Sequence, residues 1–168
     1  MKTFILVIAT AAAIAASADG SRTLAPCTGA QLAGTFKVVP GSAGAGNISY
    51  NLRLKNVSHA TCTVTGLPQG RLLGKTGKML PTHVRAALPG ALTAVLVRLA
   101  PGRSTHATAR FTPDVPGPGE PTSGTRCEPV AYWFRVTAPG DGTARAKISP
   151  PTPVCVHGRL LFSAYSAG

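Results

Sequence analysis

Proline and glycine interrupt this chain so often that no long helix fits between them. The sequence holds 19 glycines and 15 prolines among 168 residues, and beyond residue 18 no stretch keeps an apolar period of 3.6 for more than about two turns. Turn signals recur at short intervals, for example at 66–68, 101–102 and 139–142. The sequence therefore predicts many short elements joined by tight turns, with at most one short helix, at 81–87.

Alternation of apolar and polar residues identifies the strands. It is strict at 47–55 (NISYNLRLK), where Tyr50, Leu52 and Leu54 share one face with Ile48. The remaining candidate strands are 35–39, 61–65, 71–73, 92–99, 105–111, 130–137, 144–148 and 158–163. About eight short strands with no βαβ rhythm predict an all-β, antiparallel sandwich or barrel.

The N-terminal segment has the pattern of a secretory signal peptide. Lys2 precedes an uncharged stretch at 4–18, which ends in the small-x-small sequence Ala16-Ser17-Ala18. A membrane span needs about 20 apolar residues, more than this stretch supplies. We expect a signal peptide at 1–18, a single β domain at 19–168, secretion or location at the cell envelope, and no membrane span after cleavage.

Four cysteines follow the predicted cleavage site: Cys27, Cys62, Cys127 and Cys155. In an exported chain an even set predicts two disulfides, and four cysteines allow three connectivities. Pairing within each half of the chain would close loops of moderate length. Zinc is the alternative, but the sequence has no CxxC pair and no recognised finger spacing.

Several short motifs resemble one family when they are taken in order. They are Cys27, Gly44-Ala45-Gly46-Asn47, Asn56-Val57-Ser58, Thr61-Cys62, Gly66-Leu67-Pro68, Leu80-Pro81-Thr82, Leu99-Ala100-Pro101-Gly102, Cys127-Glu128-Pro129 and Pro153-Val154-Cys155-Val156-His157-Gly158. Together they are similar to domain of unknown function 4232, over roughly 25–163. The resemblance implies a disulfide-bearing β-sandwich of immunoglobulin-like type in an exported protein of actinobacterial kind. It implies no activity.

The charge balance is strongly basic, with 17 Lys and Arg against 5 Asp and Glu, a net charge of +12. Such a charge favours an anionic partner. The candidate anionic-ligand patch comprises Arg53, Lys55, Arg71, Lys75 and Lys78. The alternative is a solvated surface with no ligand. Export and the lack of basic residues interleaved with stacking aromatics disfavour nucleic acid.

Residues that would support catalysis are few. Asp114, Glu120 and Glu128 lie in or beside a proline-rich loop at 113–124, where we expect them to be solvated. The four histidines form no HExxH or HxH pattern, and 70–78 lacks the spacing of a phosphate loop. The prediction is no enzyme, no cofactor and no metal site. Trp133 is expected to be buried against a second sheet or a disulfide.

The sequence thus favours an exported, non-enzymatic binding or interaction module. Its partner would be an anionic polymer of the cell envelope or another exported protein. Two alternatives remain: a secreted hydrolase whose site the sequence does not reveal, and a protease inhibitor that presents the loop at 113–124.

Overall fold

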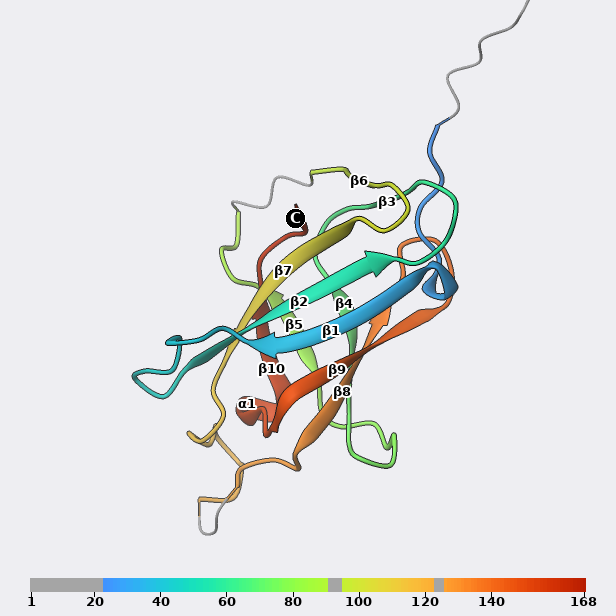
Figure 1. Ribbon diagram of the computed structural model, residues 1–168. Coiled ribbons are helices and arrows are strands. Elements are labelled where there is room, and N and C mark those ends of the chain that lie inside the picture. The colour runs from blue at the N-terminus through green and yellow to red at the C-terminus, as the bar shows by residue number, and fades with distance from the viewer. Residues whose placement is uncertain (1–22, 91–94, 123–125) are drawn as a thin grey trace, which may run out of the picture.

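The computed structural model describes residues 23–90, 95–122 and 126–168, and the predicted signal peptide lies outside them. The described part is nearly all β (Figure 1). Its strands are β1 (Leu32–Val38), β2 (Ile48–Asn56), β3 (Cys62–Val64), β4 (Gln69–Leu73), β5 (His83–Ala86), β6 (Val97–Leu99), β7 (Ser104–Phe111), β8 (Ala131–Thr137), β9 (Thr143–Thr152), β10 (Arg159–Phe162) and β11 (Ser166–Ala167). A 3-10 turn η1 (Gly29–Gln31) precedes β1, and a one-turn element α1 (Cys155–Gly158) precedes β10.

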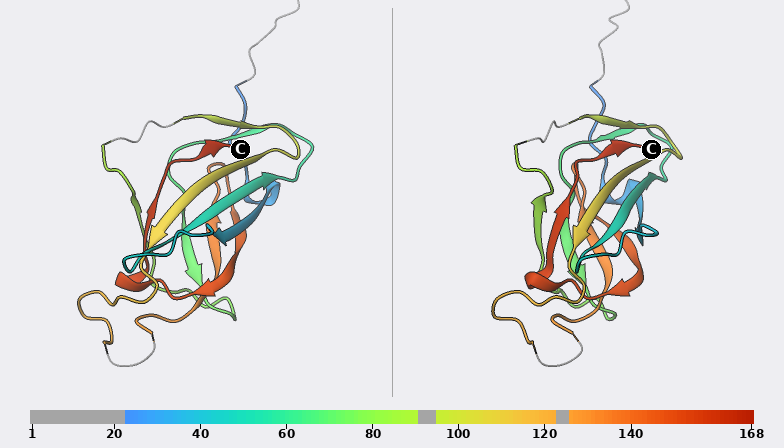
Figure 2. Two further views of the ribbon diagram at one scale, coloured as in Figure 1. Left: turned by 60° about the vertical axis from the view of Figure 1, so that its left-hand side comes forward. Right: turned by 90° about the vertical axis from the view of Figure 1, so that its left-hand side faces the viewer.

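One large sheet contains nine of these strands. Eight of them follow the order β4-β8-β9-β1-β2-β7-β10-β5. The ninth, β11, pairs with β7 and is not part of this order. Strands β3 and β6 form a separate pair. Figures 1 and 2 show the large sheet curving around a common interior.

The sheet is mixed, so the prediction of a purely antiparallel architecture is wrong for two strand pairs. β1 runs parallel to β9, and β5 runs parallel to β10. Alternation and turn spacing locate strands and favour pairing between sequence neighbours. They carry no information about β1 and β9, which come from opposite ends of the chain and become neighbours only in the folded molecule.

The two ends of the sheet, β4 and β5, approach each other without forming a ladder. The Leu72 amide donates to Thr82 Oγ1 at 2.9 Å, and Arg71 Nη1 donates to the Thr82 carbonyl at 3.3 Å. Away from Thr82 no strand pairing joins them. The sheet is therefore a nearly closed barrel that is open between β4 and β5.

The interior is filled by side chains from one face of the strands. Phe36 lies at its centre, with ring centroids 5.5 Å from Tyr50, 5.7 Å from Phe134 and 5.9 Å from Phe162. All four rings are buried. Tyr50 keeps its hydroxyl satisfied by donating to the Pro150 carbonyl at 2.9 Å. The core is thus aromatic at its centre although aromatic residues are only 5% of the sequence.

Most predicted strands are confirmed, including 47–55, which becomes β2 with Tyr50, Leu52 and Leu54 buried. Only the end of the stretch 92–99 is seen as a strand, β6, because 92–94 lie outside the described residues. The helix predicted at 81–87 is wrong, since this segment contains β5, whose ladder with β10 overrides a weak local preference. Among the described residues no helix is long and apolar enough to cross a membrane.

Candidate functional site

The five residues of the predicted patch lie in two groups. Arg53 and Lys55 are on the exposed face of β2, whereas Arg71 is on β4 and Lys75 and Lys78 are in the turn that follows it. β8, β9 and β1 separate the two groups in the sheet. The patch is therefore not one compact cluster.

Further cations occupy the strands between these groups. Arg71 lies directly opposite Arg135 on β8, and Arg135 lies directly opposite Arg145 on β9. Opposed residues on one sheet face have Cβ atoms about 4.5–5.5 Å apart. Arg71 and Arg145 are exposed and Arg135 is half-buried. We call these three residues the arginine row; its guanidinium groups project outward from three adjacent strands.

A second row continues toward β2. Lys147 on β9 lies beside Thr35 on β1, which is opposite Arg53 on β2. Lys37 on β1 is also exposed on this face. None of the described strands contains an acidic residue. We call the outer surface of β4, β8, β9, β1 and β2 the basic face. No carboxylate on these strands neutralises its positive charge.

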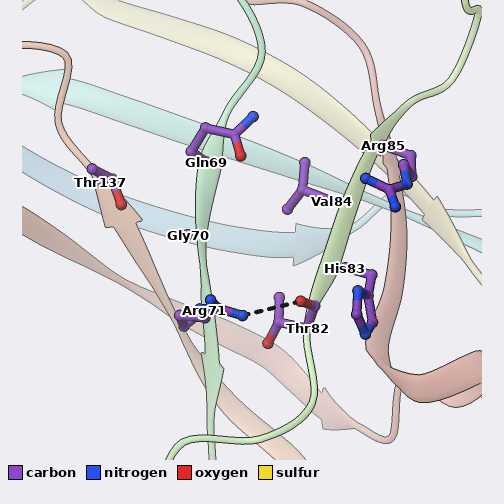
Figure 3. Close-up of a pocket in the computed structure, with 8 residues that line it drawn as sticks. All are labelled: Gln69, Gly70, Arg71, Thr82, His83, Val84, Arg85 and Thr137. Atoms are coloured by element: carbon purple, nitrogen blue, oxygen red, sulfur yellow. Dashed lines mark hydrogen bonds between the residues drawn. The ribbon is translucent and has the colours of Figure 1, made fainter.

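Like charges placed directly opposite each other on a sheet are destabilising. The contacts that do exist in the arginine row are weak: the guanidinium of Arg145 lies 5.3 Å from the ring centroid of Trp133, and Arg135 Nη2 lies 3.5 Å from Met79 Sδ. Arg71 is held by the Thr82 carbonyl at the edge of a cavity between β4 and β5 (Figure 3). Within the described residues the arginine row thus has no anionic partner.

The sequence led us to expect Trp133 to be buried against a second sheet or a disulfide, and this expectation is wrong. Trp133 is partly exposed on the outer face of β8, under Arg145, while its neighbour Phe134 is in the core. The alternation across this strand is confirmed, but the buried face is the one that carries Phe134. Trp133 therefore adds an aromatic surface to the basic face.

Lys75 and Lys78 line a second cavity, of about 660 Å³, next to the arginine row. Arg126 and Glu128 also line it, and Tyr132 contributes an aromatic ring to its wall. Cavities of this size accommodate small ligands. Three cations and one carboxylate give this cavity a positive character.

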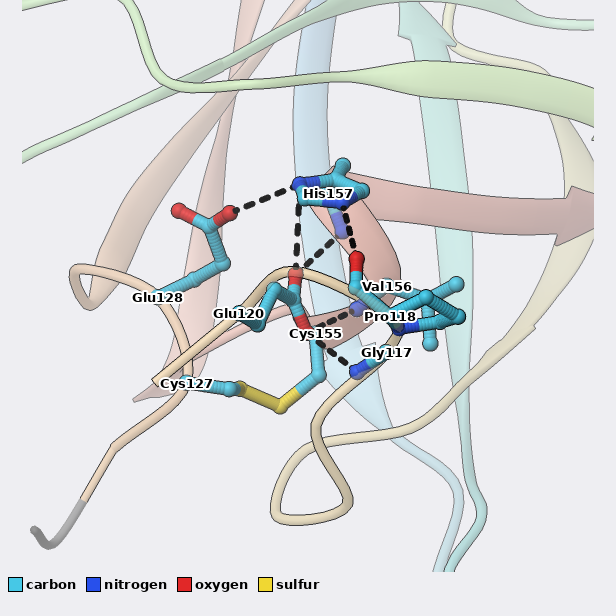
Figure 4. Close-up of polar contacts among 8 residues, drawn as sticks. All are labelled: Gly117, Pro118, Glu120, Cys127, Glu128, Cys155, Val156 and His157. Atoms are coloured by element: carbon cyan, nitrogen blue, oxygen red, sulfur yellow. Dashed lines mark hydrogen bonds and ion pairs between the residues drawn. A yellow bond between two sulfur atoms is a disulfide. The ribbon is translucent and has the colours of Figure 1, made fainter. Parts of the chain in front are cut away.

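Glu128 belongs also to a polar cluster that sequence reasoning missed (Figure 4). At its centre is Glu120, whose side chain is only 1% exposed. Glu120 Oε2 accepts hydrogen bonds from the amides of Gly117 at 2.6 Å and Val156 at 2.8 Å, and Oε1 accepts one from the amide of His157. The carboxylate thus fastens the proline-rich loop to the turn α1.

His157 completes the cluster. Its Nδ1 lies 3.8 Å from one carboxylate oxygen of Glu120 and 3.8 Å from one of Glu128. Its Nε2 is 3.0 Å from the Pro118 carbonyl, which can only accept, so Nε2 carries a proton. The ring therefore forms ion pairs with both carboxylates when Nδ1 is also protonated.

The two carboxyl groups have opposite pKa shifts. Burial alone would raise the pKa of Glu120, but three backbone amide donors and His157 outweigh it, so its pKa lies below the ordinary value. Burial, the charge of Glu120 and a hydrogen bond with it raise the pKa of Glu128, and His157 opposes this only in part. As the pH rises, Glu120 therefore loses its proton before Glu128.

The backbone of α1 is shaped to present its amides. Val156 and His157 have φ of 58° and 56°, in the left-handed region that β-branched residues rarely enter. Such a conformation costs about 1–3 kcal/mol per residue and persists only where the surroundings enforce it. Here the hydrogen bonds to Glu120 stabilise it. The expectation that Glu120 is solvated is therefore wrong.

The cysteine spacing contained a signal for this cluster. The structure contains the disulfides Cys27–Cys62 and Cys127–Cys155, so the predicted disulfides are confirmed and pair within each half. Glu128 and His157 follow Cys127 and Cys155 by one and two residues, so the second disulfide brings them together. The buried position of Glu120, by contrast, depends on the loop conformation, which the sequence does not specify.

These groups are poorly suited to bind a metal ion. Glu120, Glu128 and His157 offer ligand atoms that lie within 4.8 Å of one another. However, both oxygens of Glu120 already accept backbone hydrogen bonds, and a metal would have to displace them. All four cysteines are paired, which leaves no thiolate for the zinc alternative.

Comparison with known proteins gives one assignment. Neither the search of curated proteins nor the search of solved structures found a match. The family described as Domain of unknown function (DUF4232) matches residues 27–164, which include the basic face, both disulfides and the Glu120 cluster. The chain therefore belongs to the family Domain of unknown function (DUF4232).

Proposed function

We propose that this protein is an exported, non-enzymatic binding module that holds an anionic polymer of the cell envelope on its basic face. The observation that carries the proposal is the arginine row. Three arginines stand directly opposite one another on β4, β8 and β9, at a cost in stability and without a carboxylate beside them. A repeating polyanion would supply the missing counter-charges.

The dimensions of the basic face suit an extended ligand. Neighbouring strands are about 4.8 Å apart, so the arginine row spans roughly 10 Å and continues through the second row toward Arg53. Trp133 offers a partly exposed ring on β8 at the end of the second row, directly opposite Lys147. Lys75 and Lys78 extend the positive surface beyond the end of β4.

Export is part of the same proposal. The uncharged segment at 4–18 supports it, as do the two disulfides, which persist in oxidising compartments. Assignment to an immunoglobulin-like sandwich also stays a proposal, supported by the predominance of antiparallel pairs in the sheet.

The test is co-sedimentation of the oxidised protein with Gram-positive cell walls, before and after chemical removal of their teichoic acid. We expect binding to the intact walls only, and a steep loss of binding between about 50 and 200 mM salt, as for other polyanion ligands. The triple variant R71Q/R135Q/R145Q should lose most of this binding.

The matched control is R98Q/R103Q/R110Q, which removes the same charge from three exposed arginines outside the arginine row. If both triple variants lose binding equally, net charge alone is responsible and the basic face is not a site. Equal binding to stripped and intact walls would also contradict the proposal.

A hydrolase is the second candidate, and one observation supports it. Glu128, whose pKa is raised, lies beside His157 and also lines the 660 Å³ cavity, where a carboxylic acid could donate a proton. Hydrolysis of a chromogenic phosphodiester, lost in E128Q and retained in D114N, would establish this activity. For the inhibitor alternative, inhibition of secreted proteases is the direct assay, and E120Q should weaken it because Glu120 fastens the loop.

A further inference from the structure

The two edge strands of the large sheet face each other. β4 and β5 are the ends of the strand order, so each has a ladder on one side only, β4 with β8 and β5 with β10. Following the directions of successive pairs around the sheet makes β4 and β5 antiparallel to each other. Exposed edges of this kind are templates for pairing with another chain.

Backbone groups of both edges point into the opening. In β4, Leu72 donates its amide to Thr82 Oγ1 and accepts at its carbonyl from Leu80, so its backbone faces away from β8. Because backbone direction alternates along a strand, the amide and carbonyl of Gly70 face the same way. In β5, the Ala87 amide bonds to Phe162 of β10. Val84 is three residues before Ala87, and backbone direction alternates along a strand. The amide and carbonyl of Val84 therefore point away from β10 and toward β4.

The protein closes only one end of this opening. Thr82 bridges to β4 through its hydroxyl and its carbonyl. Beyond it the edges separate around a cavity of about 420 Å³, which Gly70 and Val84 line from opposite sides (Figure 3). A side chain at Gly70 would collide with the Arg135 carbonyl, so glycine is needed where β4 approaches β8. The cavity is thus a gap with backbone donors and acceptors on both walls.

The charge around the gap comes from arginines. Arg71, His83 and Arg85 line it, and its lining includes no carboxylate. Arg85 and His83 are exposed, and their side chains make no hydrogen bond to the described part of the chain. The gap therefore complements an extended segment that carries acidic side chains.

We propose that the gap between β4 and β5 binds an acidic, extended segment of a partner protein, which adds to the sheet as a strand. The segment pairs with Gly70 on one side and with Val84 on the other, and its acidic side chains meet Arg85 and His83. Main-chain hydrogen bonds give such a complex its affinity, and alternate side chains give it specificity. This partner differs in class from the polymer proposed above, and Arg71 is the one cation that the two sites share.

The experiment measures binding of a fluorescent, end-blocked hexapeptide that alternates valine and glutamate to the oxidised protein by anisotropy. Two peptides of the same length serve as comparisons. One carries N-methyl groups on alternate amides, which prevents strand pairing on one edge, and the other replaces glutamate with lysine. We expect saturable binding of the glutamate peptide below roughly 1 mM, and binding at least about tenfold weaker for both comparison peptides.

Two variants locate the site. V84P removes an amide that faces the gap and leaves the amides that bond to β10 in place, and edge strands accept proline at such positions. R85E reverses a charge beside the gap without touching the backbone. Each should weaken binding about tenfold or more, whereas R98E, on the distant strand β6, should stay within about threefold of the unmodified protein.

Binding of the N-methylated peptide as tightly as the glutamate peptide would overturn the proposal, because charge alone would then explain the affinity. An absence of saturable binding would also overturn it. So would unchanged peptide binding by both R85E and V84P, provided that V84P is folded. If the protein self-associates and V84P abolishes this self-association, the gap binds a second copy of the chain instead. R135Q/R145Q should bind the peptide normally, which separates this result from the wall-binding test.

Discussion

Replacement of Glu120 by glutamine should destabilise the protein far more than its position in a proline-rich loop suggests. The change keeps the shape of the side chain but removes its charge and one acceptor. Glutamine can still accept from Gly117 and Val156 through its remaining oxygen, but its amide group then faces the amide of His157, donor against donor.

The magnitude follows from these contacts. An orphaned buried donor costs about 1–3 kcal/mol, and hydrogen bonds to charged groups contribute about 1 kcal/mol more than neutral ones, here for two bonds. We therefore expect E120Q to lower the free energy of unfolding by about 4 kcal/mol, a large part of the roughly 5–15 kcal/mol typical of a domain. The substitution also removes the contact with the His157 amide, one of the two that stabilise the left-handed conformation of Val156 and His157.

The assay is denaturant unfolding with both disulfides intact, at neutral pH and again in acid. D114N is the control, because Asp114 is exposed in the same loop and should change stability by less than about 0.5 kcal/mol. Because the pKa of Glu120 is lowered in the folded protein, its ionised carboxylate contributes fully to the free energy of unfolding above the pKa of an unfolded glutamate. This contribution is lost as the pH falls through the pKa of Glu120 in the folded protein. The difference between E120Q and the unmodified protein should shrink accordingly. A loss at neutral pH no larger than that of D114N would refute the reasoning.

Three further predictions concern other parts of the molecule. R135Q should raise stability by up to about 1 kcal/mol at low salt, because it removes the central charge of the arginine row, and the gain should vanish in high salt; an equal gain at both salt concentrations would contradict this explanation. E128Q should be more stable than the unmodified protein at neutral pH, since a raised pKa makes ionised Glu128 unfavourable in the fold, and the gain should disappear below the pKa of an unfolded glutamate; thermal unfolding at both pH values tests the sign. G158A should lower stability by more than about 3 kcal/mol, because Gly158 has φ of 75° and a Cβ there would collide with the Pro81 carbonyl, whereas Gly90, also at positive φ but with open space around it, should tolerate alanine with a loss of about 1–2 kcal/mol in the same denaturant assay.

The strands are predictable because their signal is local. The alternation at 47–55 places Tyr50 and Leu52 on one face wherever β2 lies in a sheet, and the structure buries both. The order of the strands is a different kind of information. The parallel neighbours of β1 and β5 are distant in sequence, and β5 itself has only a weak pattern of its own, which resembles a short helix.

The candidate binding surface is predictable only in part for a related reason. Arg53 and Arg71 stand out in the sequence because each belongs to a dense local group of cations. Arg135 and Arg145 lie on either side of the turn between β8 and β9. Arg135 has no cation close to it in the sequence and Arg145 has only Lys147, so only the pairing register brings them beside Arg71. The burial of Glu120 escapes prediction because it depends on three amides contributed by two separate segments.

The parallel ladder between β1 and β9 also determines when the fold can be completed. β2 can pair with β1 early, since only a turn separates them, but the other edge of β1 stays open until β9 has been synthesised. Until then Phe36 lacks the cover of Phe134 and Phe162, both of which come from the last strands. Closing such a long loop before its contacts form makes folding slow, because folding rates fall as contacting residues lie farther apart in sequence. A chain truncated before β9 should therefore leave an unpaired strand and an uncovered aromatic core, the two features that make partly folded β proteins aggregate.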